Sequence, residues 1–159
     1  MPNHCHNRVT FYSANTDAVA KLKQIFTDEN CFGQIIPEPD WENTPLMSSD
    51  MPKYDWDKPK GKLGELPQMV ETPYGLSLKF LSTDKQDDRW YDWRVQNWDT
   101  KWDCYDVVVT DDDPESVEIE FNTAWSPPEA ICNQIREDYP DVSVSWFYDE
   151  PGCEIAGYL

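Results

Sequence analysis

The chain has 159 residues, a formal net charge of −18 and a sequence pI of about 4.2, and 14% of its residues are aromatic. The length suggests one domain over residues 1–159, and the aromatic content argues against general disorder. The acidity excludes general binding to nucleic acid or to anionic membranes, because phosphates would be repelled.

The cellular compartment follows from what the sequence lacks. It has no apolar run long enough to span a membrane, and its first residues lack the apolar core and cleavage site of a signal peptide. Its five cysteines are widely spaced, without a CxxC pair: Cys5, Cys31, Cys104, Cys132 and Cys153. We therefore expect a cytoplasmic protein of a host cell with reduced, mostly buried thiols.

The first predicted elements are a strand and an amphipathic helix. Residues 7–13, NRVTFYS, alternate in polarity and predict a strand with Val9 and Phe11 on one face. Thr16 is the predicted N-cap of a helix over residues 17–28, whose apolar stripe is Val19, Leu22, Ile25 and Phe26. Residues 31–36 form a short apolar segment that fits a strand end or a packed loop.

The next stretch is rich in proline. Residues 37–73 contain seven of the 13 prolines, which interrupt both helices and sheets. Residues 74–81 fit a short strand or a helical turn. We therefore predict an irregular insertion over residues 37–83.

Residues 90–102, WYDWRVQNWDTKW, hold four of the eight tryptophans. They predict a helix over residues 84–98. Helical spacing places four side chains on its inward side: Tyr91, Val95, Trp98 and Trp102. Trp90 and Trp93 lie on an adjacent strip.

The C-terminal half alternates strands with one helix. Strands are predicted at 105–110, 116–121 and 142–148, with an edge strand at 154–159 and a turn at 111–114. Between them, Ser126, Pro127 and Glu129 form a capping box for a helix that Pro140 ends. Without the insertion the order is β-α-β-β-α-β. It predicts an α+β, ferredoxin-like (split β-α-β) fold: an antiparallel sheet with helices on one face.

Three segments resemble a known family. MPNHCHNRV is similar to an MPN-x-C-x-N-x-V opening, QNWDTKWDCYDV to an NW-G-TKW motif, and FNTAWSPPEAI with WFYDEPGCEIAGYL to a C-terminal signature. All three belong to the YubB-like group, a phage- and plasmid-borne family of uncharacterised proteins with a ferredoxin-like domain. The resemblance implies that fold and a mobile-element origin, and it implies no activity.

Two positions depart from the family pattern. Asp99 stands where glycine is usual, and His4 stands where tryptophan is common. We therefore expect a different helix C-cap at Asp99 and the loss of one aromatic core contact at His4.

No catalytic, cofactor or metal site is predicted. His4, Cys5 and His6 alternate in an extended segment, so they are poorly placed to ligate one metal, and a zinc site would need further ligands such as Cys31 or Cys153. The negative surroundings disfavour a nucleophilic Cys5 thiolate.

The acidic surface carries the functional prediction. Residues 84–120 contain thirteen acidic and four basic residues, and a row of carboxylates can imitate a line of phosphates. We expect a non-enzymatic protein that binds a basic host protein, in an anti-defence or nucleic-acid-mimic role. The candidate face is Asp111, Asp112, Asp113, Glu115, Glu118 and Glu120.

Three alternatives stay open. In the first, the acidic residues serve solubility alone. In the second, the protein has a structural role in an assembly, which its edge strands and C-terminal GYL suggest. In the third, the protein is a small-ligand binder or an enzyme, with a cleft between the insertion and the tryptophan helix. That cleft would be lined by Trp56, Trp90, Trp93 and Arg94.

Overall fold

The computed structural model describes residues 3–41, 67–72, 75–80 and 89–159. The chain divides into two compact units, residues 1–37 with 94–159, and residues 38–93. The second unit therefore takes in nearly all of the predicted insertion and continues to Trp93. In the part of the chain that is described, no helix is long and apolar enough to cross a membrane.

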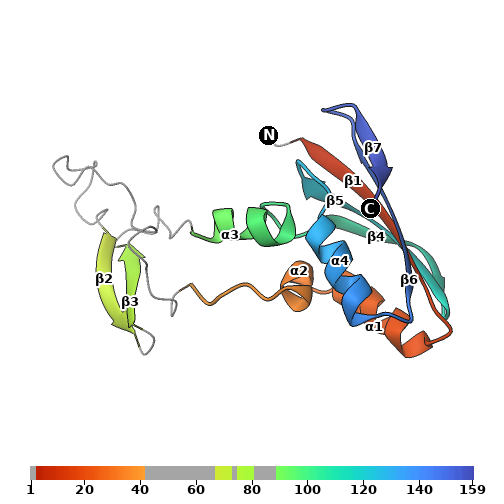
Figure 1. The fold of residues 1–159 in the computed structure, drawn as a ribbon, viewed down its shortest axis with the longest axis horizontal. Helices are drawn as coiled ribbons and strands as arrows, with labels where there is room; N and C mark the ends of the chain where they lie inside the picture. The colour runs from red at the N-terminus through yellow and green to blue at the C-terminus, as the bar shows by residue number, and fades with distance from the viewer. Residues whose placement is uncertain (1–2, 42–66, 73–74, 81–88) are drawn as a thin grey trace. The chain divides into compact units, whose positions relative to one another are not determined.

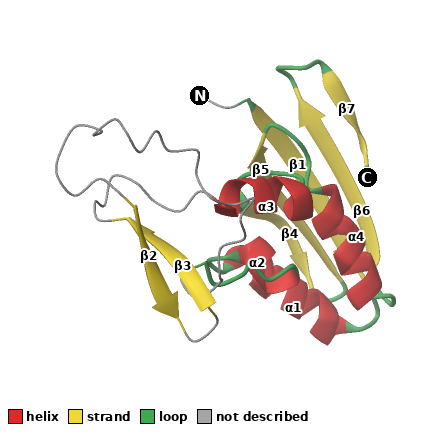
Figure 2. Ribbon diagram, turned by 60° about the vertical axis from the view of Figure 1, so that its left-hand side comes forward, coloured by secondary structure: helices red, strands yellow, loops and turns green. Residues whose placement is uncertain are grey.

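The first unit is built on a five-stranded antiparallel sheet in the order β4-β5-β1-β6-β7. Its strands are β1 (His4–Tyr12), β4 (Tyr105–Asp113), β5 (Ser116–Ala124), β6 (Ser143–Glu150) and β7 (Ile155–Tyr158). Three helices cover one face: α1 (Thr16–Thr27), α2 (Cys31–Ile35) and α4 (Glu129–Asp138) (Figures 1 and 2). β1 pairs with both β5 and β6. This is the predicted ferredoxin-like arrangement, with β7 added at an edge.

The core lies between the sheet and these helices. Val9 and Phe11 of β1 and Val117, Ile119 and Phe121 of β5 alternate inward as predicted. The apolar stripe of α1 is buried against them, and its Phe26 ring lies 5.3 Å from Phe121 and 6.1 Å from Trp146. The aromatic side chains of the sheet and of α1 therefore pack against one another in the core.

One buried polar side chain crosses this core. Asn7, which is 2% exposed, donates to the Cys5 carbonyl at 3.0 Å and to Thr123 Oγ1 at 2.9 Å. Its Oδ1 accepts from Trp146 Nε1 at 3.0 Å. Asn7 thereby ties β1 to both neighbouring strands without leaving an unpaired polar atom.

Three N-terminal predictions are corrected. β1 begins at His4, earlier than predicted, because Cys5 and Asn7 also point inward. Asn15 caps α1 in place of Thr16, and its side chain accepts from the Ala18 amide at 3.2 Å. Residues 31–35 are helical because Asp103 Oδ1 accepts the Phe32 amide at 3.0 Å, a partner that local sequence cannot reveal.

The insertion is not irregular throughout. Strands β2 (Pro67–Thr72) and β3 (Gly75–Phe80) form an antiparallel pair within the second unit. Pro67 is compatible with this pairing because it stands at the first residue of its strand. Of the two possibilities predicted for residues 74–81, a strand or a helical turn, the strand is the one found over Gly75–Phe80.

The tryptophan helix is present as α3 (Arg89–Trp98), and residues 84–88 of the prediction lie outside the described part of the chain. α3 contains residues of both units. Trp98 is buried, and its Nε1 donates to the Ile36 carbonyl at 3.0 Å. Val95 and Trp102 are each 39% exposed. The inward stripe was wrong for these two, because Trp102 lies beyond the end of α3 and Val95 is on an exposed side of the helix.

The predicted turn at residues 111–114 is also corrected. Asp111 to Asp113 belong to β4, and the reversal falls at Pro114 and Glu115. β4 has two register shifts against β5. Such bulges allow an edge strand to bend while its pairing continues.

The predicted capping box of α4 is not formed, and the side chain of Asp99 caps this helix instead. The backbone of Asp99 is left-handed, with φ of 62°, which explains why glycine suits this position after α3. Its Oδ2 accepts the Ala130 amide at 2.8 Å, and its carbonyl accepts the Ser126 hydroxyl. α4 begins at Glu129 without a side-chain cap from Pro128, so the cap comes from a distant loop.

Candidate functional site

The candidate site is the open face, defined as the side of the five-stranded sheet opposite α1, α2 and α4. Antiparallel register fixes which residues share it. Arg8 of β1 lies between Glu120 of β5 and Phe147 of β6, and His6 lies between Asn122 and Asp149. The partners of Arg8 and His6 lie more than a hundred residues away from them in the sequence.

The open face is strongly acidic. Six of the eight acidic residues in the five strands lie on it, and Arg8 is the only lysine or arginine of these strands. Glu118 and Glu120 repeat on the open face of β5, and Glu118 accepts from the hydroxyl groups of Thr10 at 3.3 Å and Thr110 at 2.9 Å. A row of carboxylates on a hydrogen-bonded sheet is held in place before any partner arrives.

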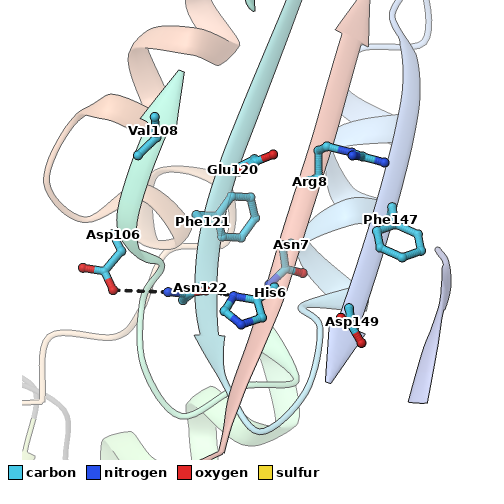
Figure 3. A pocket seen from close by; sticks show the side chains of 10 residues that line it. All are labelled: His6, Asn7, Arg8, Asp106, Val108, Glu120, Phe121, Asn122, Phe147 and Asp149. Carbon is cyan, nitrogen blue, oxygen red and sulfur yellow. Dashed lines mark hydrogen bonds between the residues drawn. The ribbon is translucent and has the colours of Figure 1, made fainter. Parts of the chain in front are cut away.

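A hollow of about 360 Å³ lies on this face across β4, β5, β1 and β6 (Figure 3). Figure 3 shows the ring of His6 near its middle, with Arg8 beside Phe147 on one side and Asp106 on the other. Glu120 and Asp149 also line it. The volume is at the lower end of the range for small-ligand sites.

A chain of hydrogen bonds orders one wall of this hollow. Asn122 Nδ2 donates to Asp106 Oδ2 at 3.2 Å, which directs Asn122 Oδ1 to His6 Nδ1 at 2.6 Å. Because a carbonyl oxygen only accepts, the proton of neutral His6 lies on Nδ1 and Nε2 carries a lone pair. His6 can therefore accept a hydrogen bond from a ligand.

Aromatic rings border the same face. The Arg8 guanidinium lies 5.5 Å from the centre of the Phe147 ring, and Phe147 packs edge-on at 5.3 Å against Tyr158, which is 70% exposed. His4 Nδ1 contacts the Tyr105 hydroxyl at 2.6 Å. The expected loss of a core contact at His4 was wrong, because position 4 is exposed.

The structure divides the predicted acidic face. Asp111 and Asp113 pair in register with Glu118 and Ser116, so they lie on the open face with Glu118 and Glu120. Asp112 pairs in register with the buried Val117 and contacts Lys23 of α1 at 2.5 Å. Glu115 lies in the turn, where its carbonyl accepts the Ser13 amide at 2.9 Å. Four of the six predicted carboxylates therefore share one surface.

The predicted aromatic cleft stays a prediction, because Trp56 lies outside the described residues. The Trp93 ring packs edge-on against Trp41 at 6.4 Å, and Trp90 against Tyr91 at 5.8 Å. The Arg94 guanidinium lies 4.9 Å from the centre of the Trp98 ring.

The His-Cys-His segment separates as its alternation indicates. His4 and His6 are exposed on the open face, whereas Cys5 is fully buried on the helix side. Burial raises the pKa of the Cys5 thiol to about 11, so it is protonated at neutral pH and is a poor nucleophile. Cys31 begins α2 on the helix side and Cys153 is exposed near β7, so neither completes a site with the histidines.

Sequence reasoning missed several residues of the hollow, namely Asp106, Asn122, Phe147 and Asp149. The alternation of β1 alone places His6 and Arg8 on the outward face. Their partners depend on which strands flank β1, and on the bulge where Asp106 adopts a left-handed φ of 55°. No local pattern carries that information.

Comparisons with known proteins agree with this architecture. Residues 97–159 match the family described as the ferredoxin-like domain in Api92-like protein. The crystal structure of protein api92 from Yersinia pseudotuberculosis is similar in fold, with a TM-score of 0.57 and 10% sequence identity over 99% of this chain and 93% of that one. No curated protein matches the chain. Neither description names an enzymatic activity.

Proposed function

We propose that this protein is a non-enzymatic interaction protein of a phage or plasmid that binds a basic host protein on the open face. The observation that carries the proposal is the gathering of Asp111, Asp113, Glu118 and Glu120 on one ordered sheet surface. The mobile-element origin rests on the resemblance to the YubB-like group. An anti-defence or nucleic-acid-mimic role follows if the partner normally binds DNA or RNA.

Electrostatics favour a cationic partner over nucleic acid itself. The four carboxylates and the neighbouring Asp106 and Asp149 outnumber Arg8, so a phosphate backbone approaching this face would be repelled. Lysine and arginine side chains would be attracted and steered. Exposed Tyr158 and half-buried Phe147 offer aromatic surface on which a guanidinium can stack.

Charge reversal tests the proposal. In the open-face variant, Asp111, Glu120 and Asp149 are replaced by lysine. In the matched control, Glu29, Glu137 and Asp138 are replaced by lysine, which changes the net charge equally through exposed residues outside the sheet. Binding of a fluorescent arginine-rich peptide and capture of host proteins are measured for both variants and the wild-type protein at low and high salt.

We expect the open-face variant to weaken peptide binding by at least about tenfold, equivalent to about 1.4 kcal/mol, while the control stays within about twofold of wild type. Raising the salt should weaken the wild-type complex, because exposed charges are screened over about 8 Å at physiological ionic strength. Equal losses in the two variants would show that net charge alone drives binding and would overturn the proposed surface.

The hollow supports a second candidate function, the binding of a small polar ligand. His6 Nε2 offers an acceptor there, and Arg8 and Glu120 offer charges of opposite sign. His6→Ala and Asn122→Ala separate the two functions. Both should abolish capture of a small ligand from a metabolite library, whereas they leave binding of the arginine-rich peptide unchanged.

A further inference from the structure

Cys31, Asp103 and Cys104 form a cluster on the helix side of the first unit, away from the open face. One potential metal-ligating atom from each residue lies within 4.8 Å of the other two, and this is the one such group found in the described part of the chain. Cys31 is the first residue of α2, while Asp103 and Cys104 directly precede β4. The fold therefore brings two thiols and a carboxylate together from distant segments.

Main-chain hydrogen bonds hold the carboxylate in position. Asp103 Oδ1 accepts the Phe32 amide at 3.0 Å and the Cys104 amide at 2.8 Å. These bonds end on one oxygen, and they lock Asp103 to the first turn of α2. Orientation of a ligand by such secondary contacts is a usual feature of metal sites.

The three side chains lie close enough together to share one cation. The sulfur atoms of Cys31 and Cys104 and a carboxylate oxygen of Asp103 all lie within 4.8 Å of one another. Replacing two thiol protons by one divalent cation keeps the total charge of the cluster unchanged, since two H⁺ leave as one M²⁺ enters.

Burial makes the site closed on one side and accessible on the other. Cys31 is 1% exposed and adjoins Phe32, which packs edge-on against Trp98 at 5.8 Å. Asp103 and Cys104 are partly exposed. A cation can therefore enter from the side of Asp103 and Cys104, where water can complete its coordination.

We propose that Cys31, Cys104 and Asp103 bind a Zn²⁺ ion, with water as the fourth ligand. Two thiolates select a soft or borderline cation over Mg²⁺ or Ca²⁺, which prefer all-oxygen sites. Zinc accepts sulfur and carboxylate ligands in a tetrahedral arrangement. The bound ion would join α2 to the segment before β4 and stabilise the helix layer over that end of the sheet.

The test uses the full chain kept reduced with a phosphine. Zn²⁺ affinity is measured by competition with a chromophoric chelator, and Co²⁺ is used as a spectroscopic probe of sulfur ligation. Cys31→Ser, Cys104→Ser and Asp103→Asn are compared with Cys132→Ser, a matched control whose thiol is buried like that of Cys31 but lies on α4.

We expect one equivalent of Zn²⁺, a thiolate-to-cobalt charge-transfer band, and affinity at least about tenfold weaker in the three cluster variants only. The wild-type protein supplies a readout that does not depend on variant folding. Zn²⁺ should slow alkylation of Cys104, located by mass spectrometry, while the exposed Cys153 reacts at an unchanged rate. Absence of stoichiometric binding, or equal loss in the Cys132→Ser control, would overturn the proposal.

Discussion

Asp99 combines two structural roles that substitution can separate. Its backbone holds a left-handed conformation, with φ of 62°, and its carboxylate caps α4 by accepting the Ala130 amide at 2.8 Å. Alanine removes the cap and is also less tolerant of the left-handed region. Glycine removes the cap but relieves the backbone, and asparagine preserves both an acceptor and the tolerance of that region.

The magnitudes follow from these two terms. Loss of a cap costs about 1 kcal/mol, and alanine in the left-handed region costs about 1 kcal/mol relative to glycine. Because aspartate lies between alanine and glycine in this preference, we expect Asp99→Ala to destabilise the protein by ~1.5 kcal/mol and Asp99→Gly by ~0.5 kcal/mol. Asp99→Asn should be as stable as wild type, because asparagine keeps an acceptor for the Ala130 amide and tolerates the left-handed region.

Urea unfolding followed by far-UV circular dichroism measures these differences at pH 7, with a common slope checked across the four proteins. The order asparagine, glycine, alanine is the informative result. Alanine and glycine variants of equal stability would refute the backbone argument. An asparagine variant as unstable as glycine would refute the capping argument.

Two further predictions concern the core. Asn7→Ala leaves the Trp146 indole N–H without its acceptor and removes two donor contacts, so we expect the free energy of unfolding to fall by about 2–4 kcal/mol. Asn122→Ala on the open face should lower it by less than about 1 kcal/mol. Urea unfolding measures both variants, and equal losses would contradict the argument that buried polar groups must be paired. Stability should also fall as pH rises from about 9 to about 11, because the Cys5 pKa is raised from 9.0 to about 11 and the unfolded chain therefore loses its proton first. Cys5→Ala should show a shallower decline over this window, and an unchanged slope would exclude Cys5 as a contributor.

The motifs behind the family resemblance are mainly structural. Within MPNHCHNRV, Cys5, Asn7 and Val9 are buried. Trp98 and Thr100 of QNWDTKW are also buried, and Thr100 Oγ1 donates to the Ala124 carbonyl at 3.0 Å. These segments specify the core and its hydrogen bonds. This explains how they can indicate the fold.

Elements with a strong apolar period can be predicted from the sequence alone. The alternation of β5 and the stripe of α1 were predicted correctly because burial of one face demands a regular repeat along the chain. The order of the elements then led to the ferredoxin-like fold. The acidity of the future open face was also evident, since Glu118 and Glu120 alternate with buried residues.

Features that depend on residues far apart in the sequence became visible only in the folded chain. α2 is helical through Asp103, α4 is capped by Asp99, and Asp112 turns from the open face to Lys23. The hollow around His6 and the cluster at Cys31 arise because strand order and helix packing bring together residues far apart in sequence. Hydrogen bonds and charges act through space over a few ångströms, and a linear pattern contains no record of which segments will meet.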